Sequence, residues 1–239
     1  MLGELFDSSQ EYAVHDRLRP HWAQTSSIVF ITFRTKDSIP VEVLKRWDLE
    51  KQDWVDRVLL ANQGSSREIA IDSAGNRSDR SAMNIREHWS DRLQLLTPLQ
   101  RRDFDFTFNR CREKKLDESL GACELKHPEI AKIVADSLLF FDGDRYHMGD
   151  FVVMPNHVHL LAAFSSPEMM ERQCSSWLHY TATKINKQLN RAGHFWQQEP
   201  FDHLVRSVEQ YDYLRRYIED NPRKAKLKQG EFLYRKLNE

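Results

Sequence analysis

Residues 146–164 read YHMGDFVVMPNHVHLLAAF, and they give the clearest indication of how this chain folds. Two runs, 146–154 and 157–164, are rich in β-branched, aromatic and aliphatic residues, which is typical of strands. Pro155 and Asn156 separate the runs, and both residue types favour turns. The stretch therefore predicts two antiparallel strands joined at a turn or bulge.

Further elements are predicted on both sides of this hairpin. Ser27–Arg34 (SIVFITFR) is a β-branched and aromatic run that predicts a first strand, and a short extended segment is expected within 194–206. Apolar residues at helical spacing, Pro in a first turn and a capping box at 207–210 all indicate helices. The expected helices cover 40–62, 82–96, 98–115, 128–140, 167–190 and 207–220. Asn221-Pro222 is expected to end the last helix. This order predicts an α+β fold, an antiparallel sheet with helices on one face.

The length of 239 residues is compatible with one domain carrying a large insertion or with two small domains. We interpret 1–239 as a single domain, enlarged after its first strand by a mainly helical insertion over 40–125. Within it, QGSSREIAIDSAGNRSDRS (63–81) has the Gly and Ser content of a flexible loop.

Composition limits the function classes only loosely. The formal net charge is −1, from 35 Lys and Arg against 36 Asp and Glu, so binding to nucleic acid would need a local basic patch. No apolar run approaches the roughly 20 residues that span a bilayer, and the N-terminal sequence does not have the pattern of a signal peptide. We therefore expect a cytoplasmic protein with no membrane partner. Three widely spaced cysteines indicate neither a disulfide framework nor a CxxC zinc site.

Two histidines, His157 and His159, are separated by one residue in the second strand of the hairpin. Side chains alternate along a strand, so both imidazoles point to one face and can converge on one ion such as Zn, Mn, Fe, Ni or Cu. The alternative is a structural role, but two histidines in an apolar strand each need partners for their ring nitrogens. A nucleotide hydrolase of the His-x-His-x-His type would need a third histidine where Leu161 stands.

Tyr213, Tyr217 and Asn221 are spaced by four, which places them along one face of the last predicted helix. A phenol is a poor nucleophile at neutral pH unless a base or a polarised substrate assists it. A tyrosine and an amide oxygen facing a di-histidine ion would suit attack on a phosphodiester. The alternative is that these tyrosines only pack against the core with wet hydroxyl groups.

A basic cluster surrounds this helix and its exit, and an aromatic segment precedes it. The cluster could contact phosphates or could be an ordinary solvated face; it consists of Arg215, Arg216, Arg223, Lys224, Lys226 and Lys228. In the aromatic segment, Trp196 could stack on a base of a single nucleic-acid strand or could fix the helix in place.

Three motifs together, MPNHVHLL, HFWQQEPFDHLVRS and YIEDNP, resemble in kind and order those of the REP-associated tyrosine transposases, which are insertion-sequence-200-like HUH single-tyrosine transposases. The resemblance covers 144–228, with weaker support from IVFITFRTKDSIP in the first strand. It implies a ferredoxin-like α+β fold in which Tyr217 is the nucleophile. His157, His159 and Asn221 would be the metal ligands, for Mg²⁺ or Mn²⁺.

The resemblance also implies an activity. It is metal-dependent nicking and joining of single-stranded DNA near hairpin-forming repeats, through a 5′-phosphotyrosine, by a monomer or homodimer. Tyr213, one turn earlier than Tyr217, is a rival nucleophile. The alternatives are a non-catalytic or domesticated regulator that binds hairpin DNA and, less favoured, a zinc hydrolase of small phosphoesters.

Overall fold

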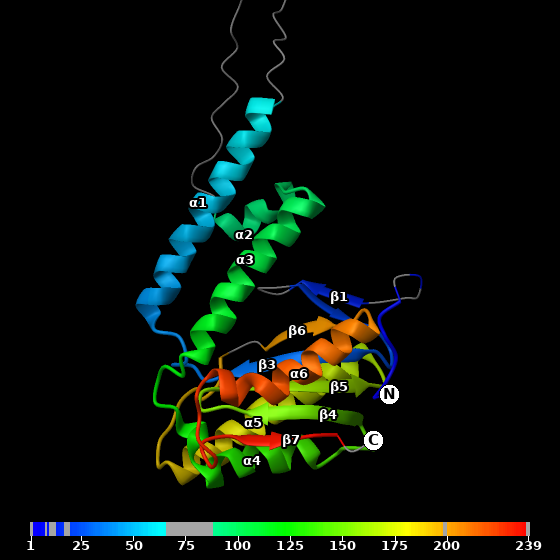
Figure 1. Ribbon diagram of the computed structural model, residues 1–239, viewed down its shortest axis with the longest axis vertical. Helices are drawn as coiled ribbons and strands as arrows, with labels where there is room; N and C mark the ends of the chain where they lie inside the picture. Colours follow the sequence, from blue (N-terminus) through cyan, green and yellow to red (C-terminus); the bar gives the residue numbers. More distant parts are fainter. Residues whose placement is uncertain are drawn as a thin grey trace, which may run out of the picture. The chain divides into compact units, whose positions relative to one another are not determined.

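The computed structural model describes residues 2–7, 9, 13–16, 20–65, 88–197 and 200–237 (Figure 1). Its internal contacts divide the chain into two compact units. One unit combines Met1–Ile39 with Lys115–Glu239, and the other is Pro40–Lys114. The first unit contains the sheet with the predicted hairpin, and the second is helical.

The sheet has five strands in the order β6-β3-β5-β4-β7, and every neighbouring pair is antiparallel. From edge to edge these strands are β6 (Phe201–Leu204), β3 (Ile28–Arg34), β5 (His157–Phe164), β4 (Tyr146–Val153) and β7 (Leu233–Arg235). Met154, Pro155 and Asn156 connect β4 to β5, and the backbone N–H of Met154 donates to the carbonyl of His157 at 2.8 Å. The predicted α+β fold with an antiparallel sheet is confirmed.

Alternation along the strands gives the sheet two apolar faces. Val29, Ile31 and Phe33 of β3 face a core formed with α4 (Pro128–Leu139) and α5 (Pro167–Gln188). Ile28 and Phe30 face the opposite side, where α6 (Val208–Lys224) packs. Figure 1 shows α6 crossing one side of the sheet, with α4 and α5 on the other.

In this respect the structure differs from the expectation of helices on one face only. All eight residues of β5 are buried, so the central strand is covered on both sides. A strand covered on both faces reads as a continuous apolar run, as in LLAAF, and not as an alternation of apolar and polar residues. The second face is covered by the apolar stripe of α6, which includes Tyr211, Leu214 and Ile218.

The two ends of α6 differ in how well the sequence predicts them. Ser207 is the N-cap, and its Oγ accepts from the N–H of Gln210 at 3.1 Å, while Gln210 Oε1 accepts from the N–H of Arg206 at 2.8 Å. The C-terminal end lies beyond the predicted stop, because Asn221 and Pro222 remain helical and the helix ends at Lys224. The N–H of Ala225 still donates to the Asn221 carbonyl at 3.0 Å, which keeps this last turn closed.

An irregularity in β4 fixes the position of α6. The register with β5 shifts between Met148 and Phe151, as in a β-bulge. The buried carboxylate of Asp150, within this bulge, accepts from Arg215 Nε of α6 at 3.1 Å and from the N–H of Leu237 at 2.7 Å. One carboxylate thus ties together β4, α6 and the segment after β7.

The helical unit is built from α1 (Val41–Ser65), α2 (Trp89–Arg92), a 3₁₀ turn (Leu93–Leu95) and most of α3 (Pro98–Asp117). Its core contains Val55, Leu59, Leu93, Leu96 and Phe104. Of the loop predicted over 63–81, residues 63–65 continue α1 and the rest lie outside the described residues. Of the helix predicted over 82–96, residues 82–87 lie outside them as well.

The structure adds short elements that the sequence does not predict. A separate two-stranded antiparallel sheet joins β1 (Ala13–Asp16) to β2 (Pro20–Ala23), and a 3₁₀ turn covers Glu124–Lys126. Across the described ranges, no helix is both long and apolar enough to cross a membrane.

Candidate active site

His157 and His159 lie side by side on the face of β5 that α6 covers. Neither side chain is exposed to solvent, and their ring centroids are 4.6 Å apart. They share this face with Leu161, which packs in the same core as α6. The pairing of β5 with β3 brings Thr32 directly opposite His159.

Each histidine is held at its Nδ1 atom. Nδ1 of His157 lies 2.7 Å from Oδ1 of Asn156, and Nδ1 of His159 lies 2.8 Å from Oγ1 of Thr32. An imidazole that is hydrogen-bonded through Nδ1 presents Nε2 to its other side, and such outer partners orient histidine ligands in metal sites. Both rings are therefore fixed in orientation by the fold.

Burial controls the charge of His159. Because the ring is fully buried, desolvation lowers its pKa from 6.5 to about 3. The imidazole is therefore neutral at neutral pH. The neutral ring is the form that binds metal ions, because a protonated imidazole has no lone pair to offer.

Tyr217 reaches this site from α6. Its hydroxyl lies 3.5 Å from Nε2 of His159, a long contact that brings together residues 58 positions apart. The ring is half-buried and packs edge-on against His159 and Phe30, with centroid distances of 5.2 and 6.1 Å. Lys224 Nζ lies 5.0 Å from the centroid of the same ring. The phenol thus lies between a neutral imidazole and a cation.

The direction of α6 carries Asn221 toward the other histidine. Figure 1 shows α6 running opposite to β5. Residue numbers therefore rise along α6 in the direction in which they fall along β5. Four helical residues advance about 6 Å and two strand residues about 6.6 Å, so the two spacings match closely. With Tyr217 beside His159, these spacings direct the turn of α6 that carries Asn221 toward the His157 end of β5.

The surroundings of Asn221 suit a side chain that acts as a ligand to a metal ion. The side chain is 0% exposed, and neither Oδ1 nor Nδ2 has a hydrogen-bond partner among the residues that the structure describes. A buried amide without partners costs roughly 1–3 kcal/mol. A bound ion that accepts the amide oxygen as a ligand would remove part of this cost.

The donor set fits a divalent metal ion. Two imidazole nitrogens and one amide oxygen would leave further coordination positions to water or substrate oxygens. The described part of the chain contains no group of three or more His, Cys, Asp or Glu side chains placed to hold a metal. The predicted set of His157, His159 and Asn221 is of a different kind, because its third member is an amide.

Tyr213, the rival nucleophile, is more exposed to solvent than Tyr217. Tyr213 is 60% exposed, and its ring stacks on that of Tyr217 with the centroids 6.4 Å apart. The Tyr217 hydroxyl contacts Nε2 of His159 at 3.5 Å, so Tyr217 is the better placed of the two tyrosines to act beside the histidines.

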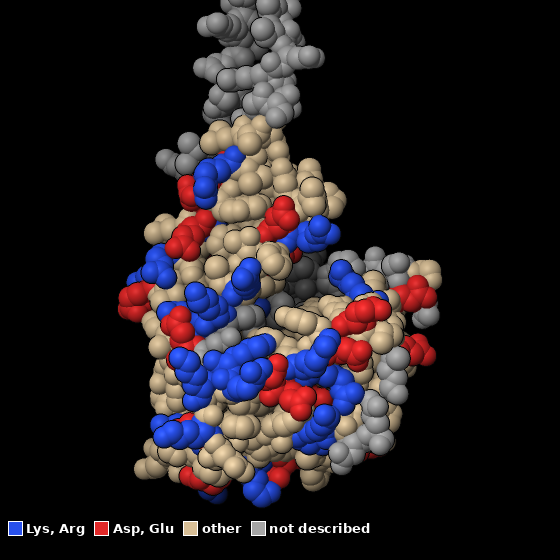
Figure 2. Space-filling view, in the orientation of Figure 1, with Lys and Arg blue, Asp and Glu red and all other residues tan. Residues whose placement is uncertain are grey.

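The predicted basic cluster separates into three groups. Arg215 is mainly buried and is bound to Asp150, so it ties α6 to the sheet. Lys224 lies over the ring of Tyr217. The remaining members are exposed: Arg216, Lys226, Lys228 and Arg223, which pairs with Asp220 at 3.0 Å. In Figure 2, basic and acidic side chains are interleaved over α6, so this face is not uniformly positive.

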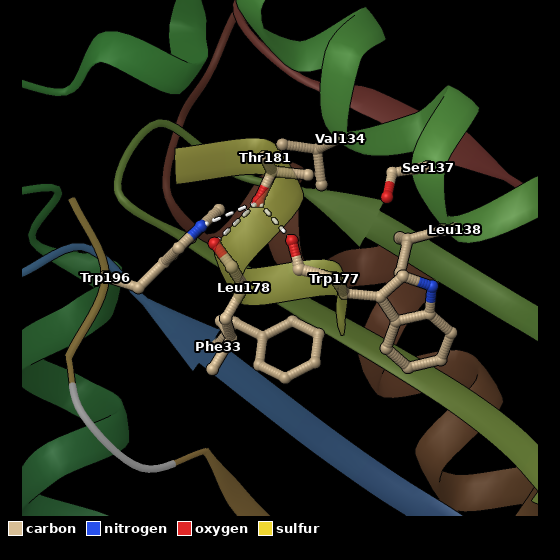
Figure 3. Close-up of a pocket in the computed structure, with 8 residues that line it drawn as sticks. All are labelled: Phe33, Val134, Ser137, Leu138, Trp177, Leu178, Thr181 and Trp196. Atoms are coloured by element: carbon tan, nitrogen blue, oxygen red, sulfur yellow. Dashed lines mark hydrogen bonds between the residues drawn. The ribbon is translucent and has the colours of Figure 1, made fainter. Parts of the chain in front are cut away.

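The structure places Trp196 in the core and not on a DNA-binding surface. The side chain is 6% exposed, and Nε1 donates to Thr181 Oγ1 of α5 at 2.8 Å (Figure 3). Its ring packs near Phe33, at a narrow apolar cavity on the side of the sheet opposite to α6. An indole enclosed in this way cannot stack on a base, which corrects the interpretation of Trp196 as a DNA contact.

Three residues of the site were not assigned a role from the sequence. Thr32 is a polar residue inside an apolar strand, and this position was the available signal. Asn156 was interpreted only as a turn residue. His203 lies against Phe30, with ring centroids 5.2 Å apart, and so extends the aromatic surroundings of the site toward β6.

No curated protein matches the chain. A solved structure described as "Structure of the REP associates tyrosine transposase bound to a REP hairpin" is similar, with a TM-score of 0.38 and 14% identity, over 85% of this chain and 71% of that chain. The family model "Transposase IS200 like" matches residues 140–221, which include both histidines, Tyr217 and Asn221. The predicted resemblance to the IS200-like transposases is thereby confirmed over residues 140–221.

Proposed function

We propose that this chain is a metal-dependent single-stranded DNA endonuclease and strand transferase that acts near DNA hairpins. The observation that carries the proposal is the 3.5 Å approach of the Tyr217 hydroxyl to Nε2 of His159, beside a second buried histidine. The family match supports a transposase-like role. Hairpin DNA as the substrate comes from the resemblance of the three sequence motifs.

In the proposed reaction, Tyr217 is the nucleophile. Its oxygen forms a bond to the scissile phosphorus while the bond from phosphorus to the 3′ oxygen breaks. The phenol loses its proton and the 3′ oxygen gains one, which leaves a 5′-phosphotyrosine and a free 3′-hydroxyl. The number of phosphodiester bonds is unchanged, so attack by a 3′-hydroxyl can rejoin DNA without ATP.

His157, His159 and Asn221 would hold the divalent ion. When bound there, such an ion supplies Lewis-acid polarisation of the scissile phosphate. Mg²⁺ prefers oxygen ligands, whereas imidazole nitrogens are also good ligands for Mn²⁺ and later transition metals. We therefore expect activity with Mn²⁺ to be at least as high as with Mg²⁺.

The protein's own contribution is mainly positioning and electrostatics. Because α6 is anchored by its apolar stripe and by the pair between Arg215 and Asp150, the backbone that carries Tyr217 is held rigidly against the sheet. The ammonium group of Lys224 near the phenol ring would stabilise negative charge developing on the attacking oxygen.

The direct test is covalent capture of DNA. Labelled single-stranded oligonucleotides with a hairpin are incubated with the protein and Mn²⁺ or Mg²⁺, and a denaturing gel reports the protein–DNA adduct. The adduct should form, should vanish in Tyr217→Phe and should persist in the matched Tyr213→Phe variant. An adduct that persists in Tyr217→Phe would move the nucleophile elsewhere. Tight hairpin binding without an adduct in any metal would favour a non-catalytic regulator instead.

A further inference from the structure

Asn156 makes hydrogen bonds through its backbone carbonyl and through both ends of its side-chain amide. It lies in the turn between β4 and β5 and is 0% exposed. Its carbonyl accepts from the N–H of Thr35 at 2.8 Å, and its Nδ2 donates to the carbonyl of Leu120 at 2.9 Å. Its Oδ1 faces Nδ1 of His157 at 2.7 Å.

These partners allow only one orientation of the Asn156 amide. The carbonyl of Leu120 can only accept, so the group that faces it must be the NH₂ group, Nδ2. Rotating the amide by half a turn would place Oδ1 against that carbonyl oxygen, which brings two acceptors together without a proton. Oδ1 must therefore face His157.

This orientation also fixes the proton on the histidine. Oδ1 of a neutral amide has no hydrogen, so the 2.7 Å contact requires that Nδ1 of His157 carries the proton. In a neutral imidazole, the other nitrogen, Nε2, then carries the lone pair. The ring is thus a potential ligand through Nε2 before any ion arrives.

We propose that Asn156 is a positioning residue that locks His157 in the Nδ1-protonated tautomer and thereby aims the lone pair of Nε2 into the active site. A purely structural turn residue would need only the bond to Leu120, which already fastens the turn. The bond to the ring is the additional feature, and it acts on a residue of the proposed metal site.

The loop that supplies the Leu120 carbonyl is itself fixed. The N–H of Ala122 donates to Asp37 Oδ2 at 2.7 Å. Gly121 has a φ of +92°, and a Cβ there would lie 2.7 Å from the carbonyl oxygen of Asp37. Glycine thus permits the close approach that holds the acceptor for Asn156 in place.

The first test needs neither a variant nor a metal. In metal-free wild-type protein with ¹⁵N-labelled histidine, a long-range ¹H–¹⁵N spectrum at neutral pH distinguishes protonated from unprotonated ring nitrogens. His157 should show a protonated Nδ1 and an unprotonated Nε2. Protonation at Nε2, or an equal mixture of tautomers, would overturn the proposal.

The second test removes the acceptor. Asn156→Leu keeps the volume of the side chain and should shift the tautomer of His157 toward Nε2–H. It should also weaken Mn²⁺ binding, measured by calorimetry, by about 10- to 100-fold, the usual effect of losing such an outer contact. The matched control is Asn186→Leu, because Asn186 also donates to a loop carbonyl, Gly193 at 2.8 Å, while its Oδ1 accepts from Arg191 and not from a histidine. An unchanged tautomer and Mn²⁺ affinity in a folded Asn156→Leu protein would refute the proposal.

The expected effect of Asn156 on metal binding rests on the proposed function. Even so, the role of Asn156 and the proposed function can be refuted separately. If no DNA adduct ever forms while His157 still has a protonated Nδ1, the proposed function fails and the role of Asn156 in fixing the tautomer stands. If the adduct forms although His157 is protonated at Nε2, the role of Asn156 fails and the proposed function stands.

Discussion

Asn221 lies one helical turn beyond Tyr217, fully buried, and its amide group has no hydrogen-bond partner among the described residues. This arrangement destabilises the metal-free fold, because a buried amide loses its bonds to water without replacement. A buried amide without partners is typical of active sites, where a less stable arrangement is retained because activity requires it.

We predict that Asn221→Leu is more stable than the wild type but inactive. Removing the unpartnered amide should raise the free energy of unfolding of the metal-free protein by about 1–2 kcal/mol. The same change should weaken Mn²⁺ binding and abolish the DNA adduct. Urea denaturation with a chelator present gives the first quantity and calorimetry the second. A less stable variant would show that the amide is satisfied in the folded protein.

The stability of the metal-free protein should fall in mild acid because of His159. Burial lowers the pKa of this ring to about 3, whereas the unfolded chain has the ordinary value of 6.5. As pH falls below 6.5 the unfolded state takes up this proton first, so stability is retained above that pH and is lost progressively toward pH 3. The slope from this group is at most about 1.4 kcal/mol per pH unit. His159→Gln should flatten the profile measured with chelator; an unaltered profile would contradict the assignment.

Arg215 and Arg216 should respond differently to the same substitution. Arg215→Met leaves the buried carboxylate of Asp150 without its cationic partner and should destabilise the protein by about 2–3 kcal/mol. Arg216 is exposed, so Arg216→Met should change stability by no more than about 0.5 kcal/mol. Thermal or urea unfolding of the two variants is the measurement. Equal losses would show that the ion pair contributes nothing specific.

Lys226 and Lys228 are exposed beyond the end of α6 and should contribute to DNA affinity without affecting the fold. If each contacts a phosphate, Lys→Gln at either position should weaken hairpin binding at low salt. It should also reduce the slope of log affinity against log salt by about one. Fluorescence anisotropy across a salt series measures both effects. A slope equal to that of the wild type would place the lysine outside the DNA contact.

Trp196 should contribute to the stability of the protein and not to its binding of DNA. Trp196→Ala removes a buried indole and its bond to Thr181, so a loss of about 3–5 kcal/mol is expected. Trp196→Phe keeps most of the volume and should bind hairpin DNA as the wild type does, once the folded fraction is taken into account. A DNA-binding defect in folded Trp196→Phe would show that the indole reaches the nucleic acid.

The sequence predicts the hairpin, the capping box of α6 and the common face of the histidines because each is a local property. Alternation along β5 and the spacing of Ser207 and Gln210 require no knowledge of distant contacts. The face covered by α6 could not be predicted in the same way, because a strand that is apolar throughout does not show which side a helix covers. Pro222 indicated a helix end, but this residue is buried inside α6 and the helix continues to Lys224.

The site itself was only partly predictable, for a related reason. Family motifs name Tyr217, the histidines and Asn221, whereas the partner of each Nδ1 depends on pairing across the fold. Thr32 reaches His159 through the register between β3 and β5, and Leu120 reaches Asn156 from a loop 36 residues earlier. The sequence gives no sign that Trp196 is buried, but α5, packed against the sheet, encloses its side chain.

The anchoring of Asn156 also affects how the chain could be shortened. The helical unit is inserted between Ile39 and Lys115, and the two segments that flank it supply Thr35 and Leu120, the two backbone partners of Asn156. A minimal version that replaces the unit with a short linker must therefore keep both flanking segments in register. If either segment shifts, the hydrogen bonds of Asn156 that orient His157 will be disturbed, although the linker itself does not contact the active site.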